Sequence, residues 1–145
     1  MTRAAGSFDY RTVGSDAYER LLATKGALRS SGLSEQLLEL VFLRVSQING
    51  CNFCIAMHRA AAHRSGATAE HLDGLAEWRD SPVFDATERA VLAWAETVTL
   101  LGDRQGVGGQ RAQLLALMTQ RQLVDLTIAV SLMNALNRVA ISLGQ

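Results

Sequence analysis

Apolar residues recur every three to four positions along almost the whole chain, and few segments alternate between apolar and polar residues. This spacing is typical of amphipathic helices, whereas half-buried strands show an alternating pattern. The single proline and the scarcity of strand signals favour the same interpretation. The pattern therefore predicts an all-α fold, a bundle of about six to seven helices.

Capping and turn residues divide the first half of the chain into four expected helices. Ser34 and Thr68 are typical N-cap residues, because their hydroxyl oxygens accept hydrogen bonds from free N–H groups of the first helical turn. Asn49-Gly50 supplies a turn, and Gly66 supplies the left-handed residue that often ends a helix. The four helices are expected over about residues 15–29, 34–48, 51–66 and 68–78.

Two capping boxes mark helix starts in the second half of the chain, Asp85-x-x-Glu88 and Thr119-x-x-Gln122. In a capping box the first and fourth residues each bond the other's backbone N–H with their side chains. The first box follows the Asp80-Ser81-Pro82 breaker, and it predicts the start of a fifth helix.

Glycines between residues 102 and 109 end the fifth helix, and a short helix is expected over about residues 110–118. A long final helix then reaches Gly144. The final helix is apolar on most sides, and a helix without a broad polar face must be covered. It is therefore expected either at the centre of the bundle or at a subunit interface.

Length and composition narrow the class of protein further. A chain of 145 residues matches one ordinary domain, so residues 1–145 are expected to form a single domain. With 14 basic against 14 acidic residues, nothing indicates disorder or a nucleic-acid partner. The start MTRAAGSFDYRTV lacks the apolar stretch of a signal peptide, and apolar runs are short for a membrane span. A cytoplasmic protein without membrane partners is expected.

The candidate chemistry lies at the start of the third helix. In a reducing compartment, Cys51 and Cys54 in a C-x-x-C pattern favour redox or metal chemistry over a static disulfide. On a helix, Cys51, Cys54 and His58 share one stripe, and His58 lies four residues after Cys54. Free N–H groups at the helix start stabilise a thiolate, the nucleophile that attacks a peroxide O–O bond. The neighbouring thiol then condenses with the sulfenic acid.

Glu39 lies ten residues before Asn49, and His58 lies nine residues after it. If the second and third helices fold back antiparallel across the turn, both side chains reach about the same height. A carboxylate there could orient the imidazole, as in a nucleophile, base and acid arrangement. Taken alone, Glu39 also shares a helix face with Glu35 and Ser46, which favours an ordinary solvated surface position.

Together, Glu39, Cys51, Cys54 and His58 form an E-x11-C-x2-C-x3-H motif. The motif resembles that of the AhpD-like alkylhydroperoxidases, within the wider carboxymuconolactone decarboxylase family. The likeness covers most of the chain from about residue 15, and it includes three further stretches: Ile48-Asn49-Gly50, residues 88–95, and Asn134-x-x-Asn137-Arg138.

This resemblance implies the AhpD-like helical fold and a thiol-dependent peroxidase or disulfide reductase. It implies that Cys54 attacks the peroxide, that Cys51 resolves it, and that Glu39 and His58 form a proton relay. It further implies no bound cofactor, a lipoyl- or thioredoxin-like dithiol reductant, and a homotrimer or homohexamer. The best-known members look similar to one another in having a second histidine immediately before the second cysteine. This chain departs from that pattern, because it has Phe53 at that place.

Other assignments remain open at this stage. The same four residues could ligate zinc, although structural zinc sites usually draw on separated loops and favour sulfur and nitrogen donors. A lyase like the carboxymuconolactone decarboxylases would not need the cysteine pair. A noncatalytic redox sensor would use the disulfide to change partners.

A few remaining polar residues have two interpretations or an ordinary one. Asn134, Asn137 and Arg138 could line a pocket, or they could be amides and a cation within helix packing. His63 and His71 are expected to be ordinary exposed histidines, since they lie off the cysteine stripe.

Overall fold

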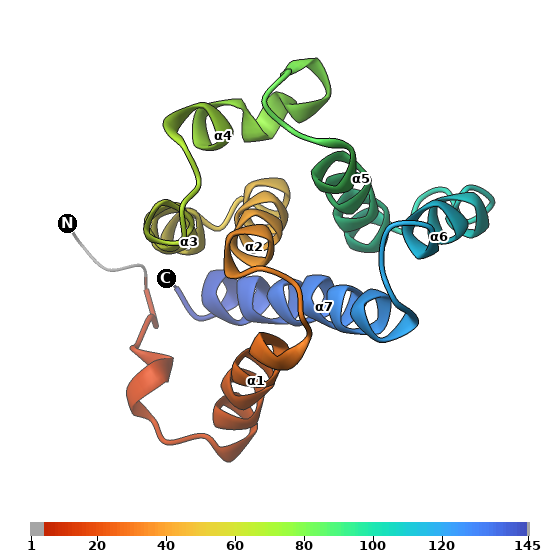
Figure 1. Cartoon of the computed structure of the whole chain (residues 1–145). Coiled ribbons are helices and arrows are strands. Elements are labelled where there is room, and N and C mark those ends of the chain that lie inside the picture. Colours follow the sequence, from red (N-terminus) through yellow and green to blue (C-terminus); the bar gives the residue numbers. More distant parts are fainter. Residues whose placement is uncertain (1–4, 145) are drawn as a thin grey trace.

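The computed structural model describes residues 5–144, so the ends of the expected 1–145 domain lie outside the described residues. Those residues form helices and no strand, which confirms the all-α prediction (Figure 1). Three 3-10 helices are short: η1 Tyr10–Thr12, η2 Leu28–Ser30 and η3 Leu75–Asp80. The seven α-helices are α1 Asp16–Ala27, α2 Glu35–Asn49, α3 Asn52–Arg64, α4 Ala69–Gly74, α5 Ala86–Leu100, α6 Val107–Leu115 and α7 Gln120–Ser142.

The predicted caps begin the helices to which they were assigned. The Ser34 hydroxyl accepts a hydrogen bond from the Leu37 N–H at 3.1 Å. Both capping boxes form, and Asp85 and Thr119 each exchange side-chain bonds with the residue three positions later. Local side-chain chemistry therefore accounts for where α2, α5 and α7 begin.

Two predicted helices differ from the structure. The fourth does not run to Trp78 as one α-helix, because the chain tightens into η3 after Gly74 and folds back on itself. A Cβ atom on Gly74 would lie 3.2 Å from Ser81 Oγ. The sixth begins at Val107 instead of residue 110, because Asp103 accepts hydrogen bonds from the backbone N–H groups just before it.

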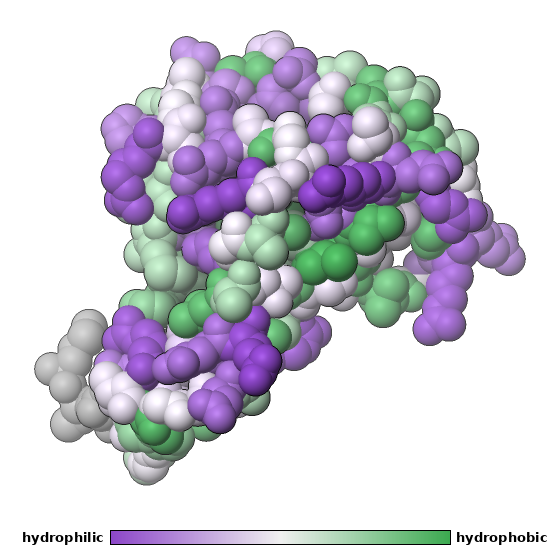
Figure 2. All heavy atoms as spheres, turned by 60° about the horizontal axis from the view of Figure 1, so that its bottom comes forward, coloured by the Kyte–Doolittle hydropathy of each residue, from purple (hydrophilic) through white to green (hydrophobic). Residues whose placement is uncertain are grey.

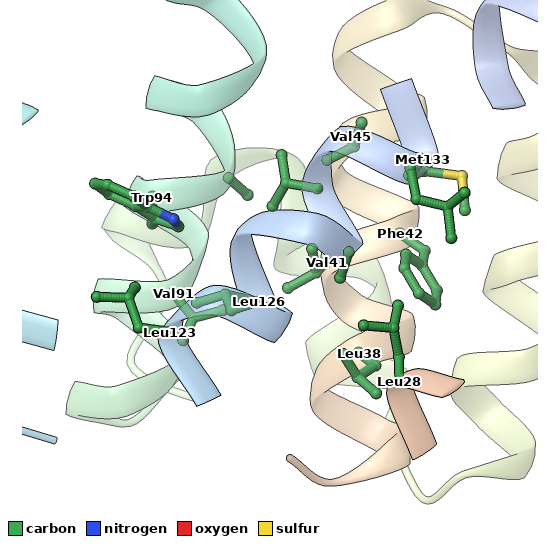
Figure 3. Close-up of a cluster of buried hydrophobic side chains, with 14 of the residues drawn as sticks. Leu28, Leu38, Val41, Phe42, Val45, Val91, Trp94, Leu123, Leu126 and Met133 are labelled. Carbon is green, nitrogen blue, oxygen red and sulfur yellow. The ribbon is translucent and has the colours of Figure 1, made fainter. Parts of the chain in front are cut away.

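Helix α2 is the central helix, with buried side chains on nearly all sides from Leu38 to Val45. One side packs against α5 and α7 (Figure 3), where Val41 and Phe42 contact a cluster that includes Val91 and Leu126. The opposite side packs on a second cluster, which α3, α4, η3 and α5 complete. Helix α3 thus lies against α2, and this packing positions the candidate site.

Helix α7 packs along α2 and also contacts α1, α3, α5 and α6. It covers α2 and α5 with one face, while Val124, Ile128 and Ile141 on other faces stay exposed. Within residues 5–144, α7 is also the one helix long and apolar enough to cross a membrane, a test that core helices of soluble proteins pass too.

Candidate active site

The chain reverses direction between α2 and α3 through a tight junction at Gly50. Gly50 has φ +70°, a left-handed conformation that costs glycine little. The Gly50 N–H donates to the Gln47 carbonyl at 3.2 Å, and the Cys51 N–H donates to the Ser46 carbonyl at 3.1 Å. This pair of bonds is a Schellman motif, which satisfies the last carbonyls of α2 and leaves Cys51 as the N-cap of α3.

A network of amides from α7 holds the same junction. Asn49 Nδ2 donates to Asn134 Oδ1 at 2.9 Å and to Asn137 Oδ1 at 3.1 Å. Asn137 Nδ2 in turn donates to Ser46 Oγ at 3.0 Å. Asn137 is fully buried, so the asparagines act in helix packing, the second of their two interpretations. They hold the end of α2 at Asn49, which only Gly50 separates from Cys51.

Cys51 and Cys54 are joined by a disulfide, and their Cα atoms lie 5.2 Å apart. The Cys54 N–H points at Cys51 Sγ, at 3.3 Å, as expected for a cap at the start of a helix. Their residues are only 1% and 3% exposed. The Cys54 N–H at the N-terminus of α3 therefore faces the sulfur atom of Cys51 in a buried site.

Glu39 and His58 meet across the α2–α3 contact, with 2.7 Å between Glu39 Oε2 and His58 Nδ1. Both residues are buried, as is Ser46, so the interpretation of Glu39 as a solvated surface residue is wrong. Because an ionised carboxylate only accepts, Nδ1 is the donor of this contact, and in a neutral imidazole Nε2 then has a free lone pair. His58 Nε2 is buried without a hydrogen-bond partner in the described structure.

A cavity of about 120 Å³ connects these groups, and both Cys54 and His58 line it. Phe53 lines it as well. The Phe53 ring leans toward the N-terminal segment, where the Arg11 guanidinium lies 5.0 Å from its centroid. Cys51 is not among the lining residues, so the cavity offers access to one sulfur, that of Cys54.

The N-terminal segment completes the site, a contribution that the sequence did not indicate. Tyr10 is buried in one cluster with both cysteines and packs edge-on against Tyr18, with 5.2 Å between ring centroids. Burial raises the pKa of Tyr10 above its ordinary value, and the neighbouring Tyr18 adds to the effect. No motif marks these residues. Their aromatic character was the one feature of the sequence that could have indicated their place in the site.

The two remaining histidines, His63 and His71, differ in how far they are exposed to solvent. His63 is exposed, as expected. The His71 side chain is only 13% exposed, because its Nε2 atom lies 3.4 Å from Glu88 and its Nδ1 atom contacts the Thr68 hydroxyl at 2.7 Å. The expectation of an exposed His71 is therefore wrong, since the residue closes the capping box of α4.

No group of three or more His, Cys, Asp or Glu side chains within residues 5–144 is arranged to hold a metal ion. A disulfide also lacks the thiolates that zinc would need. The groups of the site are thus a disulfide, a carboxylate and an imidazole. Chemically, this set can accept and donate electrons at sulfur and move a proton at His58 Nε2.

The helical fold and the buried glutamate–histidine pair beside a helix-capping disulfide define an AhpD-like protein. The chain belongs to the carboxymuconolactone decarboxylase family, which it matches over residues 15–97. Its all-α architecture is the AhpD-like fold. These findings confirm the family and the fold that the sequence motif indicated.

Individual relatives show the same likeness along most of the chain. A protein of unknown function from Agrobacterium tumefaciens, ATU0492, described as an antioxidant defence protein AhpD, is 30% identical with a TM-score of 0.87, covering 95% of this chain and 94% of that one. An uncharacterized peroxidase-related protein from Silicibacter sp. TM1040 is 25% identical with a TM-score of 0.74, covering 86% and 66%. Uncharacterized protein YdfG of Bacillus subtilis is 30% identical, covering 80% and 79%.

Proposed function

We propose that this protein is a thiol-dependent peroxidase of the alkylhydroperoxidase kind, which reduces a hydroperoxide with the Cys51 and Cys54 pair. The observation that carries the proposal is the cavity lined by Cys54 and His58 together, with His58 Nε2 unpartnered. A buried imidazole nitrogen without a hydrogen bond is costly to maintain. Its position beside a redox sulfur is explained if it exchanges a proton there during the reaction.

The reaction begins from the reduced dithiol. His58 Nε2 takes the proton of the Cys54 thiol, and the thiolate attacks the terminal oxygen of the hydroperoxide. The O–O bond breaks, an S–O bond forms, and the leaving alkoxide takes the proton back from His58, so an alcohol departs. Sulfur is oxidised by two electrons to a sulfenic acid. Glu39 keeps the imidazole in the tautomer that this step requires.

The second half of the cycle uses Cys51. Its thiol attacks the Cys54 sulfenic acid, the S–O bond breaks, and water leaves as the disulfide forms. The structure holds the pair in this oxidised state. An external dithiol, of the lipoyl or thioredoxin kind, then reduces the disulfide and is itself oxidised. We assign the attack on peroxide to Cys54, since Cys54 lines the cavity and Cys51 is not among its lining residues.

We further propose a homotrimer or homohexamer in the cytoplasm. The support is an apolar surface: Figure 2 shows hydrophobic side chains gathered in the middle of the view, below the hydrophilic band that crosses the upper part of the molecule. On α6 and α7, the exposed Leu115, Val124 and Ile128 line an open hollow of about 430 Å³. Exposed apolar area of this kind favours association. Light scattering at micromolar concentration should give a mass of three or six chains, and a monomer would contradict the assembly.

The function is tested by mixing fully reduced protein with cumene hydroperoxide and counting free thiols. We expect one hydroperoxide to consume two thiols, one cumyl alcohol to appear, and a dithiol such as dihydrolipoamide to restore both thiols and permit turnover. Cys54→Ser is the matched control, because it keeps the cavity and removes the nucleophile. Thiols that persist at millimolar peroxide would end the proposal.

The burial of the disulfide supports a second candidate, a noncatalytic redox switch. Tyr10 is buried in one cluster with both cysteines, so formation and reduction of the disulfide would be coupled to the placement of the N-terminal segment. This candidate predicts a single oxidation without turnover when peroxide and dithiol are both in excess. Sustained alcohol production would exclude it. Turnover of a lactone substrate by protein with both cysteines replaced would instead support a decarboxylase-like lyase.

A further inference from the structure

The side chains that line the cavity beside Cys54 are of three chemical kinds. Cys54 and His58 are the groups proposed to react. A second group is apolar and consists of Leu22, Phe53, Met57, Met133 and Leu136. The third consists of cationic and phenolic side chains from the N-terminal segment and α1: Tyr10, Arg11, Tyr18 and Lys25. A cavity of about 120 Å³ holds roughly four water molecules' volume, so it suits a substrate with a short carbon body.

The charge of Arg11 is already paired. Its Nε and Nη2 atoms donate to the two carboxylate oxygens of Asp9 at 2.8 Å and 3.0 Å. The guanidinium also lies against the Phe53 ring. This bidentate pair leaves Arg11 little electrostatic attraction for a further anion, and it makes Arg11 a structural part of the cavity mouth.

Lys25 differs from Arg11 in having no carboxylate partner within residues 5–144. It is half-buried, and its ammonium lies 5.6 Å from the centroid of the Phe42 ring. The same ring centroid lies 5.3 Å from that of His58. Lys25 is also the only lysine in a chain whose other 13 basic residues are arginines. Lys25 thus brings a positive charge without a carboxylate partner to the lining of the cavity, where it can pair with the anionic group of a bound molecule.

We propose that the preferred substrate is a hydroperoxide that carries a carboxylate a few bonds from its O–O group, and that Lys25 determines this specificity. The carboxylate pairs with the Lys25 ammonium, the short carbon body contacts Leu22, Met133 and Leu136, and the hydroperoxide reaches Cys54. Products leave as the corresponding hydroxy acid. The inference rests on the proposed peroxidase function, because it names the substrate of that same cavity.

The test compares one carboxylated hydroperoxide with its own neutral ester. 4-Hydroperoxy-4-methylpentanoate and its methyl ester share the O–O group and the carbon body, and they differ in charge. Second-order rates of thiol oxidation are measured for wild type, Lys25→Met, Lys25→Arg and Arg29→Met, with folding checked by melting. Arg29→Met is the matched control, since it removes one exposed cation next to α1 and outside the cavity.

Wild type should oxidise at least about tenfold faster with the carboxylate than with the ester, the range expected of one charge-assisted contact. Lys25→Met should remove that preference by lowering the rate with the carboxylate toward the rate with the ester, and Lys25→Arg should keep part of it. Raising the salt concentration should reduce the wild-type preference. Arg29→Met should behave as wild type does.

The outcomes separate the two claims. Equal wild-type rates with acid and ester, or a Lys25→Met variant that loses both rates together, would overturn the specificity and leave the peroxidase intact. Absence of oxidation by either probe and by hydrogen peroxide would overturn both. Binding gives a second measurement: 4-hydroxy-4-methylpentanoate, the product, should protect Lys25 of the disulfide form from acylation by an amine reagent. Unprotected Lys25 at saturating product would also contradict the proposal.

Discussion

The proton relay makes a graded prediction for two buried residues. In the proposed mechanism His58 accepts the proton of Cys54, so His58→Ala should slow oxidation by peroxide strongly. Glu39→Gln keeps an oxygen that can accept from His58 Nδ1 across the 2.7 Å contact, but it loses the negative charge. The second variant should therefore be slowed less, because the ring keeps its orientation and loses only the stabilisation of its charged form.

The magnitude follows from what each change removes. Positioned acid–base groups contribute about 10²–10⁴-fold, and Cys54 keeps the helix N-terminus after His58 is lost, so about 10²-fold is expected for His58→Ala. This is about 2.7 kcal/mol of barrier. For Glu39→Gln about three- to tenfold is expected, a typical value for one charge-assisted bond. In folding, His58→Ala also leaves the buried Glu39 carboxylate unpartnered, at a cost of about 1–3 kcal/mol.

The assay is stopped-flow oxidation of each reduced protein by cumene hydroperoxide from pH 5 to pH 9, with thermal melting to show that the variants fold. His63→Ala is the matched control, since His63 is an exposed histidine on the same helix. Its rate should equal that of wild type. If both relay variants also oxidise at the wild-type rate across this pH range, the relay does not exist and the cysteines act as a simple dithiol.

Four further outcomes are expected. Cys54→Ser should abolish peroxide consumption, whereas Cys51→Ser should stop after one oxidation to a sulfenic acid, detectable by dimedone labelling. Phe53→His adds an acid–base group to the cavity and should raise the oxidation rate roughly tenfold. Asn137→Leu should lower stability by about 2 kcal/mol in a urea titration, because Ser46 and Asn49 each lose a buried partner. Burial alone would raise the pKa of Glu96, but hydrogen bonds from Trp78, Arg79 and Arg44 lower it. Glu96→Gln should therefore reduce the free energy of unfolding by about 1–2 kcal/mol at pH 7. This difference shrinks as acid protonates the wild-type carboxylate.

Glu39 shows how far a helical pattern alone can mislead. On α2 its angle groups it with Glu35 and Ser46, a set that is typical of a solvated face, and yet α2 is the central helix and both Glu39 and Ser46 are buried. The turn at Asn49-Gly50 was the stronger signal, because two antiparallel helices at 1.5 Å per residue bring Glu39 and His58 to equal height. The 2.7 Å contact agrees with that construction.

The parts of the site that could not be predicted come from segments without any pattern. Tyr10 and Lys25 reach the cavity from η1 and α1, and neither the spacing of apolar residues nor a motif links them to Cys54. Their placement depends on how α1 packs against α7, a contact between segments about a hundred residues apart. Local rules determine caps and turns, but such long-range contacts depend on the whole core.

The asparagines of α7 illustrate why the same residue types admit two interpretations until the packing is known. An amide on a long apolar helix has to find partners wherever it is buried, whether these partners are a ligand or another element. Here the final turn of α2 presents Asn49 and Ser46 directly to Asn134 and Asn137. These bonds use the polar atoms at the end of α2 that precedes Cys51, so α7 holds the junction next to the disulfide through residues that are not among those lining the cavity beside Cys54. Loss of Asn137 should for that reason change the stability of the junction before it changes the chemistry at Cys54.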